Sequence, residues 1–305
     1  MYCVIDIGSN TIRLVIYRME GGKFRPILNN KHTAGLAGLV DKKNCLTQEG
    51  IDRLVRVLKD FKEVLSILPG CPVYLFATAS LRNVVNTDHV LEIVRQETGF
   101  EIRLLSGYEE AMLDYRGALR HLGEDSGLLI DIGGGSTELV FFKNKTVLAA
   151  HSFPVGSLNL HRRFVKGVLP EKKELKAMRQ EVLNVIGAQL PPSKEYVAEP
   201  MCGVGGTARA ALKLFQHLRK DGGSEPVYDA AFFEKVLEQA EDAPYKLMRH
   251  ILKISPERVH TLVPGILVFS IVAGLYGGKT VRTSPYGVRE GYLAYMLEKE
   301  GKRCD

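Results

Sequence analysis

The sequence predicts an α/β protein of two domains, each built on a mixed β-sheet flanked by helices. Three observations favour this fold class. A ten-residue pattern occurs twice, as DIGSNTIRLV at 6–15 and as DIGGGSTELV at 131–140, with five identities. After each copy the chain alternates between helical and strand patterns, as α/β folds do. The length of 305 residues is sufficient for two domains of ordinary size.

Each copy of the repeat predicts a strand, a tight turn and a second strand. The turns are rich in Gly, Ser and Asn, which tolerate positive φ and form local hydrogen bonds. Such a hairpin presents backbone N–H groups and hydroxyls to a phosphate, and the Asp beside it can hold a divalent cation through water. The alternative is two ordinary hairpins in which Asp and Gly only form turns. The repetition favours the phosphate-binding interpretation.

The first half of the chain continues with strands and helices in alternation. Apolar residues at a spacing of three to four predict a helix at Leu46–Leu68, with Thr47 as its N-cap. The other expected elements are a strand near Phe24–Leu28, the strand Val73–Ala77, a helix at Thr87–Thr98 and the strand Glu101–Leu105. The pattern starts again at Leu128, so a second domain is expected from about residue 116.

In the second half, the sequence CGVGGTAR at 202–209 joins a strand to a helix. A helix N-terminus at glycines is a ready anion-binding site, because its first N–H groups have no partner within the helix. Helices are also expected at Lys172–Leu190 and at about Tyr286–Glu300. The apolar stretch Leu262–Tyr276 is too short to span a bilayer and predicts a buried helix.

Composition limits the function classes. Lys and Arg total 41 against 35 Asp and Glu, a net charge of +6, which serves either solubility or attraction of a polyanion. The five cysteines lack C-x-x-C spacing, which gives no zinc signature and indicates reduced thiols in the cytoplasm. The residues before Asp6 lack the features of a signal peptide. We expect no nucleic-acid partner and no membrane partner.

Two adjacent acids, Glu109 and Glu110, are predicted to have different roles. Ser106-Gly107-Tyr108-Glu109 is a capping-box sequence, in which Glu109 reaches back to the N–H of Ser106. Glu110 has no such structural role, and the helix dipole favours its carboxylate form in the first turn. A positioned carboxylate can orient and deprotonate water, whereas the alternative for Glu110 is a solvated residue that stabilises the helix.

Seven motifs occur in an order that resembles the exopolyphosphatase/guanosine pentaphosphate phosphatase family of the actin–Hsp70–sugar kinase superfamily. They are DIGSNTIRL, ATASLRN, LSGYEEA, DIGGGSTEL, PVGSLNL, GVGGT and SPYGVREG, between Asp6 and Gly291. The resemblance implies two ribonuclease-H-like domains with a cleft between them. With the superfamily pattern, domain I comprises 1–115 and a returning C-terminal helix at 290–305, and domain II comprises 116–289.

The resemblance also implies a Mg²⁺-dependent (or Mn²⁺-dependent) hydrolase that removes terminal phosphates from polyphosphate or guanosine pentaphosphate, and it suggests a homodimer. The second Glu of its S-G-x-E-E-A motif, here Glu110, is the expected catalytic base, and Arg82 is expected to contact a phosphate or to brace Glu110. Asp131 and Glu138 are the expected metal ligands, with Asp6 as a possible third carboxylate. The expected substrate-binding residues are Gly8, Ser9, Asn10, Thr11, Gly133, Gly134, Gly135, Ser136, Thr137, Gly205, Gly206, Thr207 and Arg289.

The chain departs from the family pattern in two segments. Thr33–Gly38 replaces an Arg-Leu-Gly type of stretch, and His260 follows Arg258 where the family has Asp. The sequence also ends soon after its last motif, so a short member without the additional C-terminal domain is expected. Basic clusters at His161–Lys173 and Lys246–Arg258 are expected to be solvated helix faces, and the alternative is a track that binds polyphosphate. The alternatives to a hydrolase are a superfamily kinase of small molecules and a non-catalytic sensor of polyphosphate or nucleotide.

Overall fold

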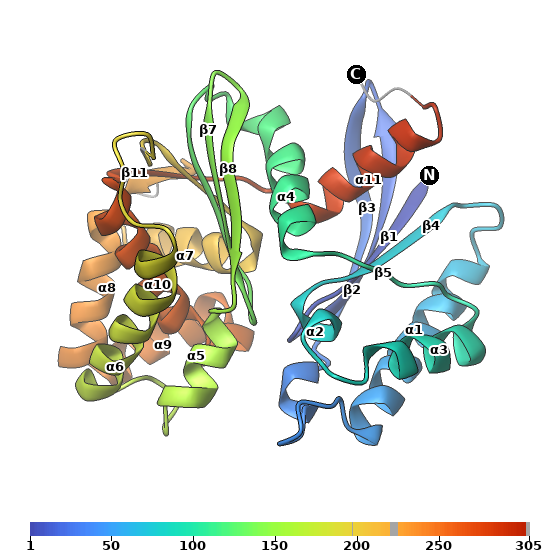
Figure 1. The fold of residues 1–305 in the computed structure, drawn as a ribbon, viewed down its shortest axis with the longest axis horizontal. Coiled ribbons are helices and arrows are strands. Elements are labelled where there is room, and N and C mark those ends of the chain that lie inside the picture. The colour runs from blue at the N-terminus through green and yellow to red at the C-terminus, as the bar shows by residue number, and fades with distance from the viewer. Residues whose placement is uncertain (197, 220–224, 303–305) are drawn as a thin grey trace. The chain divides into compact units, whose positions relative to one another are not determined.

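The computed structural model describes residues 1–196, 198–219 and 225–302. Its contacts divide the chain into two compact units. Unit one comprises Met1–Leu113 and Arg289–Asp305, and unit two comprises Asp114–Val288. Both units have a mixed sheet flanked by helices, which confirms the predicted fold class (Figure 1).

Unit one has a five-stranded sheet in the order β3-β2-β1-β4-β5. Strand β1 is antiparallel to β2 and parallel to β4. The strands are β1 (Tyr2–Ile7), β2 (Ile12–Glu20), β3 (Lys23–His32), β4 (Val73–Ala77) and β5 (Arg103–Leu104). The helices are the 3₁₀ turn Leu36–Leu39, α1 (Gln48–Ser66), α2 (Ala79–Arg82), α3 (Thr87–Thr98) and α11 (Val288–Lys299), with α4 (Gly107–Leu122) continuing across the unit boundary.

Helices cover both faces of this sheet. Alternate residues of β1, among them Ile5 and Ile7, share a buried core with α1 and α3. On the opposite face, Phe76 of β4 packs edge-to-face on Tyr292 of α11, with ring centroids 4.8 Å apart. The period of two along a strand sends successive side chains to opposite faces. The C-terminal helix α11 therefore packs on one face of the sheet to which the N-terminal strand β1 belongs.

Unit two has a six-stranded sheet in the order β10-β11-β9-β6-β7-β8. Its strands are β6 (Gly127–Ile132), β7 (Thr137–Lys143), β8 (Thr146–Phe153), β9 (Met201–Val204), β10 (Val227–Asp229) and β11 (Thr280–Thr283). Its helices are α5 (Ser157–Phe164), α6 (Lys172–Val182), the π-helix Leu183–Gly187, α7 (Gly205–Leu218), α8 (Ala231–Asp242), α9 (Pro244–Ile254), the 3₁₀ turn Pro256–Arg258 and α10 (Leu262–Tyr276).

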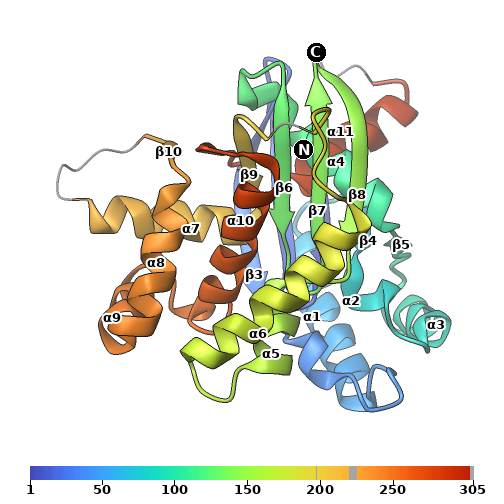
Figure 2. The same cartoon turned by 60° about the vertical axis from the view of Figure 1, so that its left-hand side comes forward.

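The two sheets repeat one topology. In each, three antiparallel strands follow one another along the chain, and the first of them then pairs in parallel with a later strand. Figure 2 shows β6, β7 and β8 side by side. The sequence repeat at 6–15 and 131–140 thus marks equivalent hairpins, β1–β2 and β6–β7.

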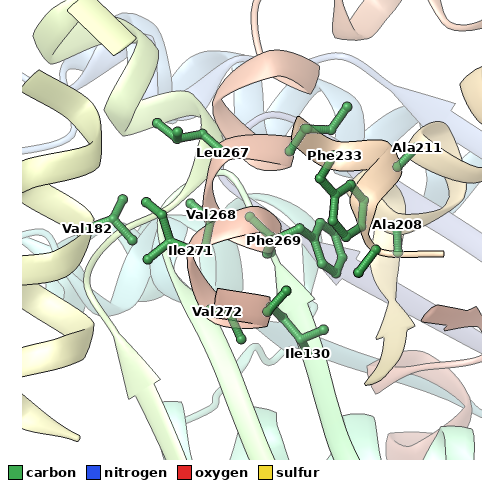
Figure 3. Packing of buried hydrophobic residues seen from close by; sticks show 14 of the residues in the cluster. Ile130, Val182, Ala208, Ala211, Phe233, Leu267, Val268, Phe269, Ile271 and Val272 are labelled. Carbon is green, nitrogen blue, oxygen red and sulfur yellow. The ribbon is translucent and has the colours of Figure 1, made fainter. Parts of the chain in front are cut away.

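Helix α10 is the centre of the core of unit two. It is apolar on all sides and its bounds match the predicted buried helix. Phe269 stacks on Phe233 of α8, with ring centroids 5.0 Å apart, and both lie in the cluster around Ile130 of β6 (Figure 3). Among the residues that the structure describes, no helix combines the length and apolarity needed to cross a bilayer.

Most of the predicted elements are present, with differences at their ends. The bounds of β4 and α3 match, and Thr47 caps α1 by accepting a hydrogen bond from the N–H of Gly50 at 3.3 Å. The strand expected at Glu101–Leu105 is only two residues long, because only Arg103 and Leu104 pair with β4. The helix expected at Lys172–Leu190 changes to π geometry from Leu183.

Phe269→Ala is expected to destabilise unit two by about 3–5 kcal/mol, because it leaves a cavity against Phe233 in a fully buried cluster. Urea denaturation followed by circular dichroism measures the change. The control is Tyr245→Ala at a side chain that is 79% exposed, for which the free energy of unfolding should change by less than about 0.5 kcal/mol. Equal effects of the two variants would contradict the central role of α10.

Candidate active-site residues

The two repeated hairpins close their turns in the same way. The N–H of Gly8 donates to the carbonyl of Thr11 at 3.0 Å, and the N–H of Gly133 donates to the carbonyl of Ser136 at 2.9 Å. Each loop is four residues long, because Ile7 pairs with Ile12 and Ile132 pairs with Thr137. The sequence repeat therefore encodes one loop conformation used twice, with Ser9 and Asn10 in the first loop and Gly134 and Gly135 in the second.

The charged pairs beside the two loops differ. The first loop is flanked by an acid and a base, and the second by two acids. Asp6 lies directly across the β-ladder from Arg13, whereas Asp131 lies across from Glu138. Residues directly opposite one another share a face of the sheet, and like charges there repel. The second hairpin thus holds two carboxylates side by side. Glu138 is 1% exposed and accepts a hydrogen bond from the hydroxyl of Ser152 at 2.7 Å.

Asp6 is neutralised within unit one. Its carboxylate lies 3.3 Å from a guanidinium nitrogen of Arg289, at the start of α11. Burial raises the pKa of Asp6, and the charges of Arg289 and Arg13 oppose that rise. Burial alone would lower the pKa of Arg289, but Glu290 and Asp6 raise it overall. Arg289, expected to bind substrate, is in this structure the partner of Asp6, and Tyr17 donates to Glu290 beside it.

Helix α5 supports the second loop, as the PVGSLNL motif requires. The N–H of Ser157 donates to the carbonyl of Gly133 at 2.9 Å. The carbonyl of Gly134 accepts from the N–H groups of Leu158 and Asn159, each at 3.0 Å. The side chain of Asn159 donates to the carbonyl of Gly135 at 3.0 Å. The loop carbonyls therefore face α5. Within the described part of the chain, the N–H groups of Gly134 and Gly135 donate to no backbone carbonyl, so they are available to an anion.

The third glycine loop, between β9 and α7, lies against the second. Gly205 has φ +74°, and a Cβ there would lie 2.0 Å from a carboxylate oxygen of Asp131. Gly206 is equally constrained, since its Cβ would lie 1.8 Å from a guanidinium nitrogen of Arg258. Only glycine permits both approaches. The N-terminus of α7 is thereby placed directly beside Asp131.

Two threonines expected to bind substrate use their hydroxyls to hold the loops. Thr207 donates to the carbonyl of Ile132 and Thr137 donates to the carbonyl of Val155, each at 2.6 Å. Both residues are fully buried. Their side chains connect β6 and β7 to neighbouring segments, so these two hydroxyls are used within the protein.

Arg258 is a candidate that the sequence patterns missed. The sequence predicts a solvated helix face at Lys246–Arg258, but α9 ends at Ile254 and Arg258 is half-buried in the following 3₁₀ turn. Its guanidinium reaches the hydroxyl of Thr207 at 3.4 Å. Burial and Arg209 lower its pKa, whereas Glu257 and Asp131 oppose this. The sequence signal for a residue such as Arg258 was the pair of glycines in the GVGGT loop. Because glycine has no side chain, it leaves room for a large neighbouring side chain.

In unit one, the capping box at the start of α4 is formed as predicted. The N–H of Ser106 donates to Glu109 at 2.8 Å, and the N–H of Glu109 donates to the hydroxyl of Ser106 at 3.1 Å. The backbone hydrogen bond from Ser106 is the main factor that lowers the pKa of Glu109, and Arg103 at 2.8 Å also contributes. Glu109 is therefore occupied by the helix cap.

Glu110 is held by a different cation. It is 9% exposed and forms an ion pair with Arg82 at 2.9 Å. The same guanidinium nitrogen donates to the carbonyl of Leu105 at 2.9 Å, which fixes the position of Arg82. The ATASLRN and LSGYEEA motifs thus meet in one ion pair. The structure shows the bracing role that the sequence allowed for Arg82.

The Ppx/GppA phosphatase family model matches residues 15–300. The chain belongs to this family. A putative exopolyphosphatase of Haemophilus influenzae is 28% identical over 99% of the chain and 92% of its own length. A guanosine-5'-triphosphate,3'-diphosphate pyrophosphatase of Vibrio vulnificus is 27% identical over all of this chain and 61% of its own length. The solved exopolyphosphatase of Cytophaga hutchinsonii has the same fold, with a TM-score of 0.82 at 24% identity over 99% of both chains.

Gly205→Ala should disturb Asp131 and lower kcat/KM for phosphate release by at least about tenfold, since small misplacements at a reacting centre have large effects. Gly277→Ala is a matched control, because Gly277 has the same φ of +74° with no atom within 4 Å of the added Cβ. Both variants share a backbone strain of about 1–2 kcal/mol, and Gly205→Ala adds the displacement of Asp131. A Gly205→Ala enzyme as active as the control would contradict the constraint.

Proposed function

We propose that this Ppx/GppA family phosphatase is a Mg²⁺-dependent phosphohydrolase that releases terminal orthophosphate from inorganic polyphosphate or guanosine pentaphosphate. The observation that carries the proposal is that the adjacent residues Glu109 and Glu110 have different partners. The capping box occupies Glu109, whereas Glu110 is a nearly buried carboxylate held by Arg82. Glu110 is then the base that accepts a proton from the attacking water.

Phosphate binding is assigned to the loops. Hydrolysis of a phosphoanhydride needs positioning and charge neutralisation more than covalent chemistry. The N–H groups of Gly134 and Gly135, together with the N-terminus of α7 at Gly205 and Gly206, supply donors for phosphate oxygens. Arg258 adds a positive charge at the same loop. The matching loop at Gly8–Thr11 supplies the corresponding donors in unit one.

Asp131 and Glu138 fit a magnesium ion. Their like charges face one another across a β-ladder, which a divalent cation between or beside them would relieve. The described residues contain no group of three or more His, Cys, Asp or Glu side chains suited to a metal, but Mg²⁺ commonly takes one or two carboxylates and keeps several waters. When bound, the ion would neutralise charge on the substrate's phosphate oxygens. Asp6 has Arg289 as its partner and is not assigned to the ion.

Support for the substrate class comes from the relatives. One similar protein is named a putative exopolyphosphatase, and another is named a guanosine-5'-triphosphate,3'-diphosphate pyrophosphatase. Both substrates end in a phosphoanhydride, so one set of phosphate loops serves either. Release of orthophosphate without any acceptor molecule would distinguish this hydrolase from a kinase or a sensor. Comparing kcat/KM on the two substrates, with polyphosphate length varied, determines the preference.

Glu110→Gln is expected to lower kcat by about 10²–10⁴, the usual contribution of a general base, with folding and substrate binding retained. The neighbouring variant Glu109→Gln is the control. It should keep most of its activity and lose about 1 kcal/mol or less of stability through the weakened cap. Orthophosphate release and thermal unfolding are measured for both. An inactive Glu109→Gln beside a nearly normal Glu110→Gln would reverse the assignment.

Activity is expected to require Mg²⁺ or Mn²⁺ and to disappear in excess EDTA, because the proposed ligands are hard carboxylate oxygens. Asp131→Asn should raise the Mg²⁺ concentration for half-maximal activity by about tenfold or more. Asp6→Asn is the comparison, and its Mg²⁺ requirement should be unchanged because Asp6 pairs with Arg289. Full turnover in EDTA, or equal shifts for both variants, would refute the metal assignment.

A further inference from the structure

Two cysteines of unit one lie in contact. The sulfur atoms of Cys3 and Cys71 are 3.2 Å apart, although the residues are 68 positions apart in sequence. Cys3 is in β1 and is fully buried, whereas Cys71 precedes β4 and is partly exposed. Neither residue has a part in the phosphate loops or the carboxylates described above.

The backbone around this pair is already held in place. The N–H of Cys3 donates to the carbonyl of Pro72 at 2.9 Å, and Cys3 is the register partner of Val73 in the parallel β1–β4 ladder. A disulfide has a sulfur–sulfur distance of about 2.05 Å, so the two sulfurs need to approach by only about 1 Å. The backbone hydrogen bond and the β-ladder hold the two segments together during this approach.

Cys45 and Cys202 have different surroundings from this pair. The sulfur of Cys45 contacts the carbonyl of Lys43 at 3.9 Å, and Cys202 is buried in β9 of unit two. Among the described residues, the thiol-to-thiol contact is confined to Cys3 and Cys71. Cys304 lies outside the described residues. Among the described cysteines, oxidation to a disulfide within the chain therefore favours this one pair.

We propose that Cys3 and Cys71 are an oxidative modification site, a dithiol that a peroxide converts to an intramolecular disulfide. The sulfur of Cys71 attacks one peroxide oxygen, the O–O bond breaks, and a sulfenic acid and one water form. The sulfur of Cys3 then attacks the sulfur of Cys71, the S–O bond breaks, and a second water leaves with the proton of Cys3. Two thiols are oxidised, the peroxide is reduced, and two waters result.

The order of the two steps follows from the environment of each thiol. Cys71 is partly exposed whereas Cys3 is fully buried, so a small oxidant is expected to react first at Cys71. Cys3 is shielded by the core, and burial together with the contact to Cys71 raises its pKa to about 12. Cys3 therefore remains a thiol until the sulfenic acid forms directly beside it. This arrangement gives a slow but selective cross-link.

The disulfide would stabilise unit one without changing its native geometry. It joins the start of β1 to the residue before Pro72, where the two segments are already hydrogen-bonded. A cross-link between residues far apart in sequence restricts the unfolded chain more than the folded one. Oxidation is expected to raise the melting temperature by several degrees and to leave orthophosphate release unchanged.

The test uses the full chain treated with hydrogen peroxide, blocked with N-ethylmaleimide, and digested without reductant for mass spectrometry. The expected product is a peptide pair joined through Cys3 and Cys71, lighter by two hydrogens and released by dithiothreitol. Cys71→Ser should eliminate it, whereas Cys45→Ser should retain it. Oxidation of Cys71 to a sulfinic acid while Cys3 stays unlinked, or a predominant link to another cysteine, would overturn the proposal.

A second measurement covers the case in which the variants fold poorly. The melting temperature of oxidised wild-type protein is compared with that of the same sample after reduction, so no variant is needed. A higher melting temperature that reduction reverses supports the cross-link. An unchanged or lower melting temperature in a wild-type sample shown by mass spectrometry to be linked would contradict the inference that the native geometry accepts the disulfide.

Discussion

The close approach of the Asp131 carboxylate to Gly205 is the constraint on which the glycine loops of unit two depend. Asp131 occupies the space that any side chain at position 205 would need. The loop after β9 and the loop after β6 lie together because β6 and β9 pair in parallel, with Asp131 opposite Val204. The glycine at 205 then lets the N-terminus of α7 come beside the carboxylate. One residue later, the guanidinium of Arg258 likewise occupies the space that a side chain at Gly206 would need. Glycine is required here for the space it leaves to a charged neighbour as well as for its backbone freedom.

The two hairpins show how a repeated loop acquires different chemistry in each copy. Both loops close with the same hydrogen bond, from the glycine N–H to the carbonyl three residues later. They differ at the residue that faces the aspartate, which is Arg13 in the first copy and Glu138 in the second. In the first copy the Asp is neutralised by protein cations and serves to attach α11. In the second, two carboxylates face one another, and under the proposed function they hold a cation. The residue opposite the aspartate is therefore the difference between the two copies.

The adjacent glutamates at the start of α4 also differ in what their carboxylates contact. A capping box consumes the carboxylate of Glu109, and the ion pair with Arg82 orients that of Glu110. The first residue stabilises the helix and the second is left at its first turn with a fixed orientation. A helix N-terminus therefore provides both a rigid support and a favourable potential for a carboxylate.

By itself the sequence determined the α/β class, the paired hairpins, the Thr47 cap and the capping box, because these depend on local periodicity and on hydrogen bonds between near neighbours. Through the family motifs it also predicted a part in the chemistry for Glu110, Arg82 and Asp131, which stays a prediction. Only the tertiary structure decided that Arg289 pairs with Asp6 across 283 positions, that Thr137 and Thr207 use their hydroxyls internally, and that Arg258 leaves the predicted solvated face to lie on Gly206. These outcomes depend on which distant segments pack together. Side-chain partners over such separations are set by sheet order and burial, which a local pattern does not encode.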